Sequence, residues 1–179
     1  LPIAFHLVES EPENEQLSLF DEPAGQQFAA LAITFSEEDS YLFLTSRDLT
    51  SDYLKEKLLS AETIVAADLK PALSVLGIHE AEPRFREKFF DRTIAAYLIN
   101  PLKGDYPCED VAKDYLGLMI PSRTDLLGKT NPAAAVKENP DALLRYGCWE
   151  SYIAWKSYPV LSESLKEHGM DRSEERRVG

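Results

Sequence analysis

The 179-residue chain is long enough for one domain with a full hydrophobic core, and 44% of its residues are hydrophobic. Its formal net charge of −12 excludes the broad basic surface by which a protein binds nucleic acid tightly on its own. Two cysteines give no disulfide framework, and no apolar run approaches the roughly 18 residues of a membrane span. We expect a cytoplasmic protein without a membrane partner and, since no initiator methionine is present, a piece of a longer chain.

The first part of the chain predicts a layer of strands. Apolar and aromatic runs predict three of them, over residues 2–8, 28–35 and 41–45. The acidic segment 36–40 joins the last two, which is typical of a hairpin. Residues 10–27 are polar and acidic, so we expect an exposed and disordered loop. Thr50 or Ser51 is expected to cap the helix that follows.

Residues 63–101 predict the scaffold around which the rest of the chain folds. The apolar run 64–67 predicts a buried strand, and leucines at helical spacing then predict a helix that ends before Gly77. Asp91 is expected to be the N-cap of a further, amphipathic helix. The apolar face of that helix is expected to carry Ile94, Tyr97 and Leu98.

The remaining residues predict mostly helices. Residues 109–116 are expected to form a short helix that ends at Gly117, and residues 119–130 are expected to be irregular. Asn139, followed by a proline, predicts the start of a long helix that Pro159 bends or restarts. Side chains spaced three or four residues apart predict its buried stripe: Leu144, Cys148, Tyr152 and Trp155.

This order of elements predicts an α/β fold, a mixed sheet flanked by helices. We expect a single domain over residues 1–170. The charged tail 171–179 carries no pattern and is expected to lie outside the fold, either disordered or left over from cloning.

Three strings in one order carry a resemblance to a known family: IVAADLKPALSVLGI, FFDRTIAAYLINP and DVAKDYLGL. Together they resemble the 3′–5′ exonuclease domain of bacterial family A, polymerase-I-type, DNA polymerases. The resemblance covers residues 3–170 and implies the ribonuclease-H-like 3′–5′ exonuclease fold. It also implies a polymerase domain in the same chain, which would use Mg²⁺ to extend DNA in replication and repair.

Active members of that family resemble other two-metal enzymes, in which four carboxylates hold two divalent cations. The motifs place these four positions at His6, Val8, Ala72 and Glu150. Tyr146 matches the tyrosine one helical turn before the last position. Because one carboxylate cannot offset the repulsion between two hard cations, the resemblance implies a domain without catalytic residues, metal or cofactor. Such a domain would support the polymerase domain structurally, and DNA would be bound through the parent enzyme.

An active exonuclease with shifted acids is the first alternative, and its candidate residues are Glu9, Asp68, Asp91 and Glu150. Glu9 is one residue beyond Val8, so the alternation of a strand directs its side chain to the opposite face. Asp68 and Asp91 are interpreted more simply as helix N-caps. His6 is interpreted as an ordinary strand residue rather than a metal ligand.

A partner-docking module is the second alternative. A pentapeptide in the acidic loop resembles, at all five positions, the motif by which many bacterial proteins bind the replication sliding clamp: Gln16, Leu17, Ser18, Leu19 and Phe20. The apolar side chains of such a peptide enter a cleft, while Gln16 would supply a directed hydrogen bond. The competing interpretation is that these apolar residues fold back onto the domain.

Overall fold

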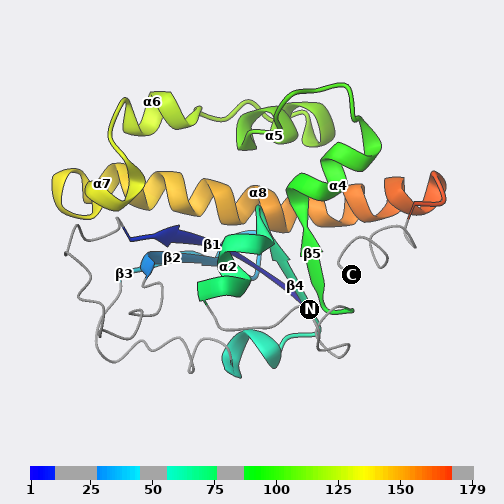
Figure 1. The fold of residues 1–179 in the computed structure, drawn as a ribbon, viewed down its shortest axis with the longest axis horizontal. Coiled ribbons are helices and arrows are strands. Elements are labelled where there is room, and N and C mark those ends of the chain that lie inside the picture. Colours follow the sequence, from blue (N-terminus) through cyan, green and yellow to red (C-terminus); the bar gives the residue numbers. More distant parts are fainter. Residues whose placement is uncertain (11–27, 45–55, 76–86, 171–179) are drawn as a thin grey trace, which may run out of the picture.

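The computed structural model describes residues 1–10, 28–44, 56–75 and 87–170. Its centre is a five-stranded mixed sheet with the order β3-β2-β1-β4-β5 (Figure 1). The strands are β1 (Pro2–Glu9), β2 (Phe28–Thr34), β3 (Ser40–Leu44), β4 (Thr63–Ala66) and β5 (Phe89–Asp91). Strand β2 pairs antiparallel with both β1 and β3, whereas β4 pairs parallel with both β1 and β5. The expected strands and the hairpin are confirmed.

Helices cover both faces of the sheet. They are α2 (Leu69–Val75), α4 (Arg92–Ile99), α5 (Cys108–Leu116), α6 (Arg123–Leu127), α7 (Pro132–Glu138) and α8 (Pro140–Glu167). Helix α8 runs along one face of the sheet, and α4, α5, α6 and α7 all contact it (Figure 1). Helix α2 lies on the opposite face. The α/β class is therefore confirmed, and none of the helices described is both long and apolar enough to span a membrane.

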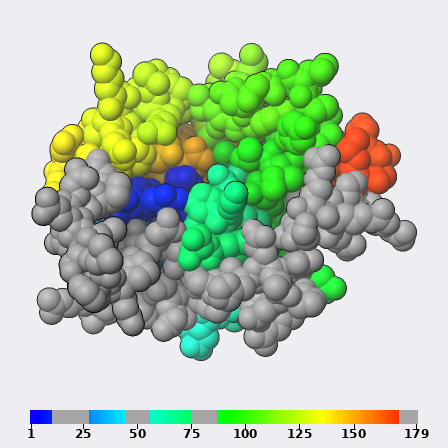
Figure 2. Space-filling view, viewed as in Figure 1, coloured from blue at the N-terminus to red at the C-terminus, as the bar shows by residue number. Residues whose placement is uncertain are grey.

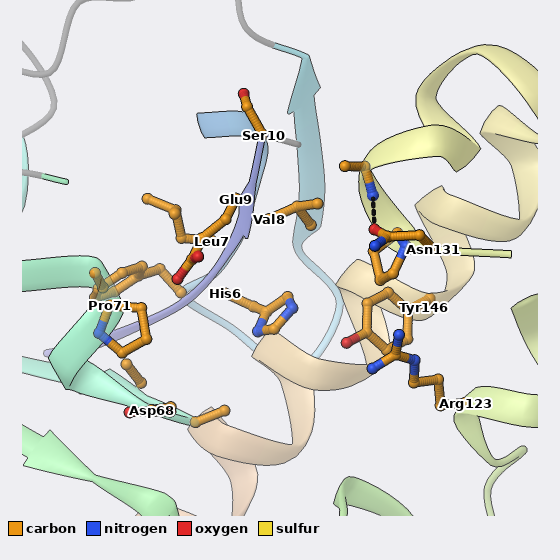
Figure 3. A pocket seen from close by; sticks show the side chains of 16 residues that line it. His6, Leu7, Val8, Glu9, Ser10, Asp68, Pro71, Arg123, Asn131 and Tyr146 are labelled. Carbon is orange, nitrogen blue, oxygen red and sulfur yellow. Dashed lines mark hydrogen bonds between the residues drawn. The ribbon is translucent and has the colours of Figure 1, made fainter. Parts of the chain in front are cut away.

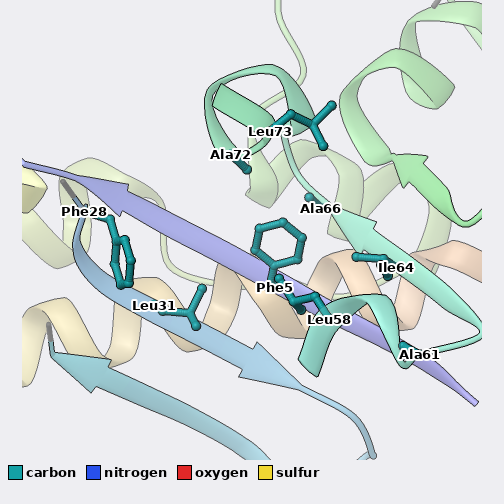
Figure 4. Close-up of a cluster of buried hydrophobic side chains, with 9 residues drawn as sticks. All are labelled: Phe5, Phe28, Leu31, Leu58, Ala61, Ile64, Ala66, Ala72 and Leu73. Carbon is teal, nitrogen blue, oxygen red and sulfur yellow. The ribbon is translucent and has the colours of Figure 1, made fainter. Parts of the chain in front are cut away.

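The face of the sheet opposite α8 carries a hydrophobic cluster (Figure 4). Phe5 of β1 and Ile64 of β4 are fully buried at its centre. Ala72 and Leu73 of α2 point toward these strands and cover them (Figure 4). Because side chains alternate along a strand, the neighbouring Val65 belongs instead to the cluster beneath α8. The packing of α2 thereby fixes the position of Ala72 beside the end of β1.

Helix α8 approaches the sheet closely at Gly147, and the predicted stripe of large side chains is wrong. A Cβ atom on Gly147 would lie 3.0 Å from Leu42 Cδ1 and 3.3 Å from Ala32 Cβ, so the helix approaches the sheet too closely for large residues there. Leu144 is 44% exposed. The other members of the predicted stripe are only partly buried: Cys148, Tyr152 and Trp155. Half of the residues that α8 buries are small: Ala142, Gly147, Ser151, Ala154 and Ser157. The other half are large, and they stand at other positions than the predicted stripe: Leu143, Tyr146, Ile153, Leu161 and Leu165.

Two further expectations about α4 and α8 need correction. Helix α8 continues through Pro159 without a break, because this proline lies on the exposed side, where water can replace the lost hydrogen bond. In α4, Ile94 and Tyr97 are 40% and 42% exposed, and the buried residues are Arg92, Ala95 and Ala96. Alanine adds little to an apolar pattern in the sequence, although its small side chain allows close packing of a helix.

The segment 119–130 was expected to be irregular but contains α6. Ser122 and Asp125 form a reciprocal capping box at its start, in which each side chain accepts a hydrogen bond from the other residue's backbone N–H. Helix α7 follows, with Asn131 as its N-cap and a proline in its first turn. Both helices start with capping residues that can be recognised in the sequence. Because the helices are short and show little apolar periodicity, no second pattern supports the capping signal.

The predicted helix caps are confirmed where the structure describes them. Asp91 caps α4, Asn139 caps α8, and Gly117 ends α5 with a φ of 64°. The residues 11–27, Thr50, Ser51, Gly77 and the tail 171–179 lie outside the described residues.

Candidate functional site

A cavity of about 420 Å³ opens at the edge of the sheet where the parallel strands β1 and β4 end. Such edges, beyond the carboxyl ends of parallel strands, are the usual place for ligand sites in α/β folds. Sixteen described residues line this cavity, and they come from β1, the β4–α2 turn, α2, the α6–α7 segment and α8 (Figure 3). In Figure 2 the blue surface of β1 is visible between α2 and the yellow α7.

Four of the five residues singled out by the motifs line this one cavity: His6, Val8, Ala72 and Tyr146. The side chains of His6 and Val8 project from the same side of β1, toward α8 (Figure 3). Glu9 projects from the other side of the strand and is exposed (Figure 3). The structure therefore brings together positions that are 140 residues apart in sequence, as the resemblance implies for a nuclease site.

The side chains at these positions are neutral. The ring of His6 meets the ring of Tyr146 edge to face, with centroids 5.4 Å apart. Burial lowers the pKa of His6, and burial raises the pKa of Tyr146, so both groups are uncharged near neutral pH. The charged side chains that act on the imidazole are Glu150, Arg92, Arg123 and Asp68.

Glu150, the fifth position, does not belong to the residues that line the cavity. Its Oε2 atom lies 3.1 Å from Nη1 of Arg92, and the side chains are 13% and 3% exposed. Burial acts most strongly on this carboxyl and would raise its pKa, but Arg92 together with His6 and Arg123 leaves the pKa lowered. The carboxylate that the motifs retain is thus ionised and already paired with a cation.

The shifted acids of the active alternative do not gather around Glu150. Asp91 accepts hydrogen bonds from the backbone N–H groups of Ile94 and Leu69, both at 2.9 Å, so its two oxygens hold the starts of α4 and α2. Asp68 accepts a hydrogen bond from the Lys70 backbone at 3.2 Å, also in the first turn of α2. These two carboxylates serve as helix caps.

The residues present do not fit a pair of divalent cations. Mg²⁺ and Mn²⁺ prefer oxygen ligands, whereas the three motif positions in the cavity offer an apolar Val8, the methyl group of Ala72 and a half-buried imidazole with a lowered pKa. Two carboxylates also line the cavity, but Asp68 caps α2 and Glu9 projects from the other side of β1 (Figure 3). Within residues 1–10, 28–44, 56–75 and 87–170, no group of three or more His, Cys, Asp or Glu side chains is placed to hold a metal ion.

Comparison with solved structures shows the fold. NrnC of Brucella melitensis matches with a TM-score of 0.69 at 15% identity, over 99% of this chain and 79% of NrnC. A structure described as the apo form of the nuclease matches over the same shares with a TM-score of 0.70, also at 15% identity. The EXO domain of Nibbler from Aedes aegypti matches with a TM-score of 0.59 at 12% identity, over 99% of this chain and 84% of that domain. The fold is the ribonuclease-H-like 3′–5′ exonuclease fold. No protein-family model matches the sequence, and a search of curated proteins finds no match.

Three polar residues at or beside the cavity were missed by the sequence reasoning: Arg92, Arg123 and Asn131. Arg123 belongs to the segment 119–130 that was expected to be irregular, and Asn131 follows that segment directly as the N-cap of α7. Arg92 could have been noticed, because an arginine between a buried strand and an apolar helix requires a buried partner. The pentapeptide 16–20 lies outside the described residues.

Proposed function

We propose that this chain is a non-catalytic 3′–5′ exonuclease-like domain, retained for the support it gives to a polymerase domain of the polymerase I type in the same protein. The exonuclease fold provides the framework of the proposal. The sequence resemblance, which the fold comparisons do not test, supplies the link to a polymerase.

One observation carries the non-catalytic part. Three of the four positions that the motifs assign to metal-binding carboxylates line one cavity, and they hold His6, Val8 and Ala72. A two-metal phosphodiesterase needs several oxygen ligands to offset the repulsion between its cations. The fourth position, Glu150, is paired with Arg92 at 3.1 Å. The framework of a nuclease site is present while its ligands are replaced.

Direct titration with Mn²⁺, followed by electron paramagnetic resonance of the free ion, tests this part. We expect the chain to bind Mn²⁺ no more tightly than its Ala72→Ser variant, since neither carries a carboxylate at His6, Val8 or position 72. Tight binding of two ions per chain, lost in Glu150→Gln, would favour the active exonuclease with shifted acids instead.

Reading the coding sequence on either side of this segment tests the polymerase part. We expect it to continue into a polymerase domain of family A. An open reading frame that joins this segment to an unrelated domain would overturn the polymerase assignment and would leave the non-catalytic assignment untouched.

Docking to the sliding clamp through Gln16, Leu17, Ser18, Leu19 and Phe20 is a second candidate function. The observation in its favour is the match of all five positions to the clamp-binding pattern. The two functions are compatible, because the pentapeptide shares no residue with the motif positions His6, Val8, Ala72 and Glu150.

A further inference from the structure

Arg92 carries a positive charge although its side chain is buried. It is the first residue of α4, directly after β5, and its side chain is 3% exposed. Besides the contact with the carboxylate of Glu150, its Nη1 donates to the backbone carbonyl oxygen of Glu150 at 3.4 Å. Its Nε–H group is buried without an acceptor among the residues described. A guanidinium with an unsatisfied donor is held there by its ion pair rather than by a complete set of hydrogen bonds.

The partner of Arg92 is the one acidic residue left among the four motif positions. Glu150 lies one turn after Tyr146 on α8, and Tyr146 lines the cavity against His6. The bond to Arg92 therefore joins a fixed positive charge to the carboxylate that, in an active relative, would be shared with metal ions.

We propose that Arg92 replaces the divalent cations as the electrostatic partner of Glu150 and thereby excludes a metal ion from this carboxylate. This inference rests on the proposed non-catalytic function and names Arg92 as the residue that keeps a metal ion away from Glu150. Arginine carries its charge at every pH of interest and has no acceptor atom, so it cannot itself bind a cation. A divalent ion at Glu150 would have to approach the guanidinium in a site of low dielectric, where repulsion is strong.

The position of the ion pair explains why burial of Glu150 is tolerated without metal. An isolated carboxylate with this burial would be strongly destabilising, and desolvation acts to raise the pKa of Glu150. Arg92 acts most strongly against that effect, and with His6 and Arg123 it leaves the pKa of Glu150 lowered. The domain consequently folds around this carboxylate independently of divalent ions, whereas an active site of this type depends on them to offset its negative charges.

The test introduces carboxylates at the three altered motif positions and then removes the positive charge of Arg92. One variant carries His6→Asp, Val8→Glu and Ala72→Asp with Arg92 retained, and its matched partner adds Arg92→Gln. Folding of both is checked by circular dichroism in EDTA, and Mn²⁺ affinity is measured by isothermal titration calorimetry. We expect the variant without Arg92 to bind Mn²⁺ about tenfold more tightly or better, since a like charge next to the site has been removed. Equal affinities in the two variants would overturn the proposal.

A less intrusive pair keeps the test decisive if three new carboxylates prevent folding. Ala72→Asp is compared with Ala72→Asp/Arg92→Gln, and the rise in Tm on addition of Mn²⁺ is measured for each. A larger rise without Arg92 is expected, and equal rises would contradict the inference. Either failure is distinguishable from failure of the proposed function, which would appear as metal-dependent nuclease activity of the unaltered chain.

Discussion

The imidazole of His6 on β1 and the ring of Tyr146 on α8 meet edge to face, with centroids 5.4 Å apart. This contact joins the sheet to the helix at the cavity, and it leaves a titratable ring half-buried. Burial lowers the pKa of His6 from its ordinary value of about 6.5. The positive charges of Arg92 and Arg123 also lower this pKa, whereas the negative charges of Glu150 and Asp68 act to raise it.

The lowered pKa of His6 predicts a loss of stability on acidification. Above pH 6.5 the ring is neutral in both the folded and the unfolded chain, so it makes no contribution to the pH dependence. As the pH falls below 6.5, the unfolded chain takes up the proton first, and the free energy of unfolding decreases by up to about 1.4 kcal/mol per pH unit for this one proton. Chemical denaturation between pH 7 and the onset of carboxylate titration measures the slope.

The variant His6→Phe keeps an aromatic edge against Tyr146 and removes the titration, so we expect a flatter profile below pH 6.5. His168→Gln is the matched control, because His168 is exposed at the end of α8. It should keep the wild-type slope. A wild-type slope in His6→Phe would show that His6 does not dominate this range.

The buried pair of Arg92 and Glu150 predicts strong coupling in stability. Arg92→Met or Glu150→Leu alone leaves an uncompensated buried charge and is expected to cost about 3 kcal/mol of unfolding free energy. The double variant removes both charges and should recover most of that loss. Urea denaturation of the four proteins gives the coupling energy.

An exposed pair provides the comparison for this cycle. Lys166 and Glu163 are 3.9 Å apart with side chains 61% and 68% exposed, so Lys166→Met should leave stability close to that of the wild type. Additive effects of Arg92→Met and Glu150→Leu would contradict the account of this ion pair.

A buried chain of hydroxyl groups joins the sheet to α8. Thr34 Oγ1 lies 2.8 Å from Ser151 Oγ and 2.7 Å from Ser40 Oγ, and both Thr34 and Ser151 are fully buried. Thr34→Val keeps the shape and removes the shared partner, which is expected to cost about 1–2 kcal/mol. Thermal or urea unfolding measures the loss.

The double variant Thr34→Val/Ser151→Ala should lose less than the sum of the single changes, because no buried hydroxyl is then left without its partner. Ser60→Ala, at an exposed serine, should change stability little. A strictly additive result would mean that the two hydroxyl groups act independently.

The pentapeptide 16–20 predicts a direct interaction with the sliding clamp. The whole chain is titrated against the clamp by surface plasmon resonance, beside a Leu19→Ala/Phe20→Ala variant. We expect binding by the first and its loss in the second. Leu102→Ala/Met119→Ala is the matched control, since these apolar residues are 94% and 85% exposed elsewhere on the domain. Equal binding by all three proteins, or binding by none, removes the clamp hypothesis.

Much of the sheet could be predicted from the sequence because strands with one or two buried faces leave a strong apolar pattern. Phe5, Ile64 and Leu31 lie in the core as their runs indicate. The buried face of α8 could not be read in the same way. Half of the residues that it buries are small, and two of them, Gly147 and Ser151, give no apolar signal. Short helices such as α6 are defined by caps rather than by periodicity.

The candidate site was predictable as a set of positions and not as a set of contacts. The motif register indicates that His6, Val8 and Ala72 lie together, and the structure places them around one cavity. Nothing in the spacing of residues 92 and 150 indicates that Arg92 contacts Glu150, because that pairing depends on how α4 crosses α8. Contacts between distant elements require the fold.

The most direct test of the central claim is a single-turnover nuclease assay. The chain, in excess over a 5′-labelled single-stranded oligonucleotide, is incubated with Mg²⁺ or Mn²⁺ and compared with an EDTA control. The account predicts no shortening beyond that control, because the three motif positions that line the cavity carry no carboxylate to hold the cations. A ladder of shortened products that requires the metal and disappears in Glu150→Gln would contradict it.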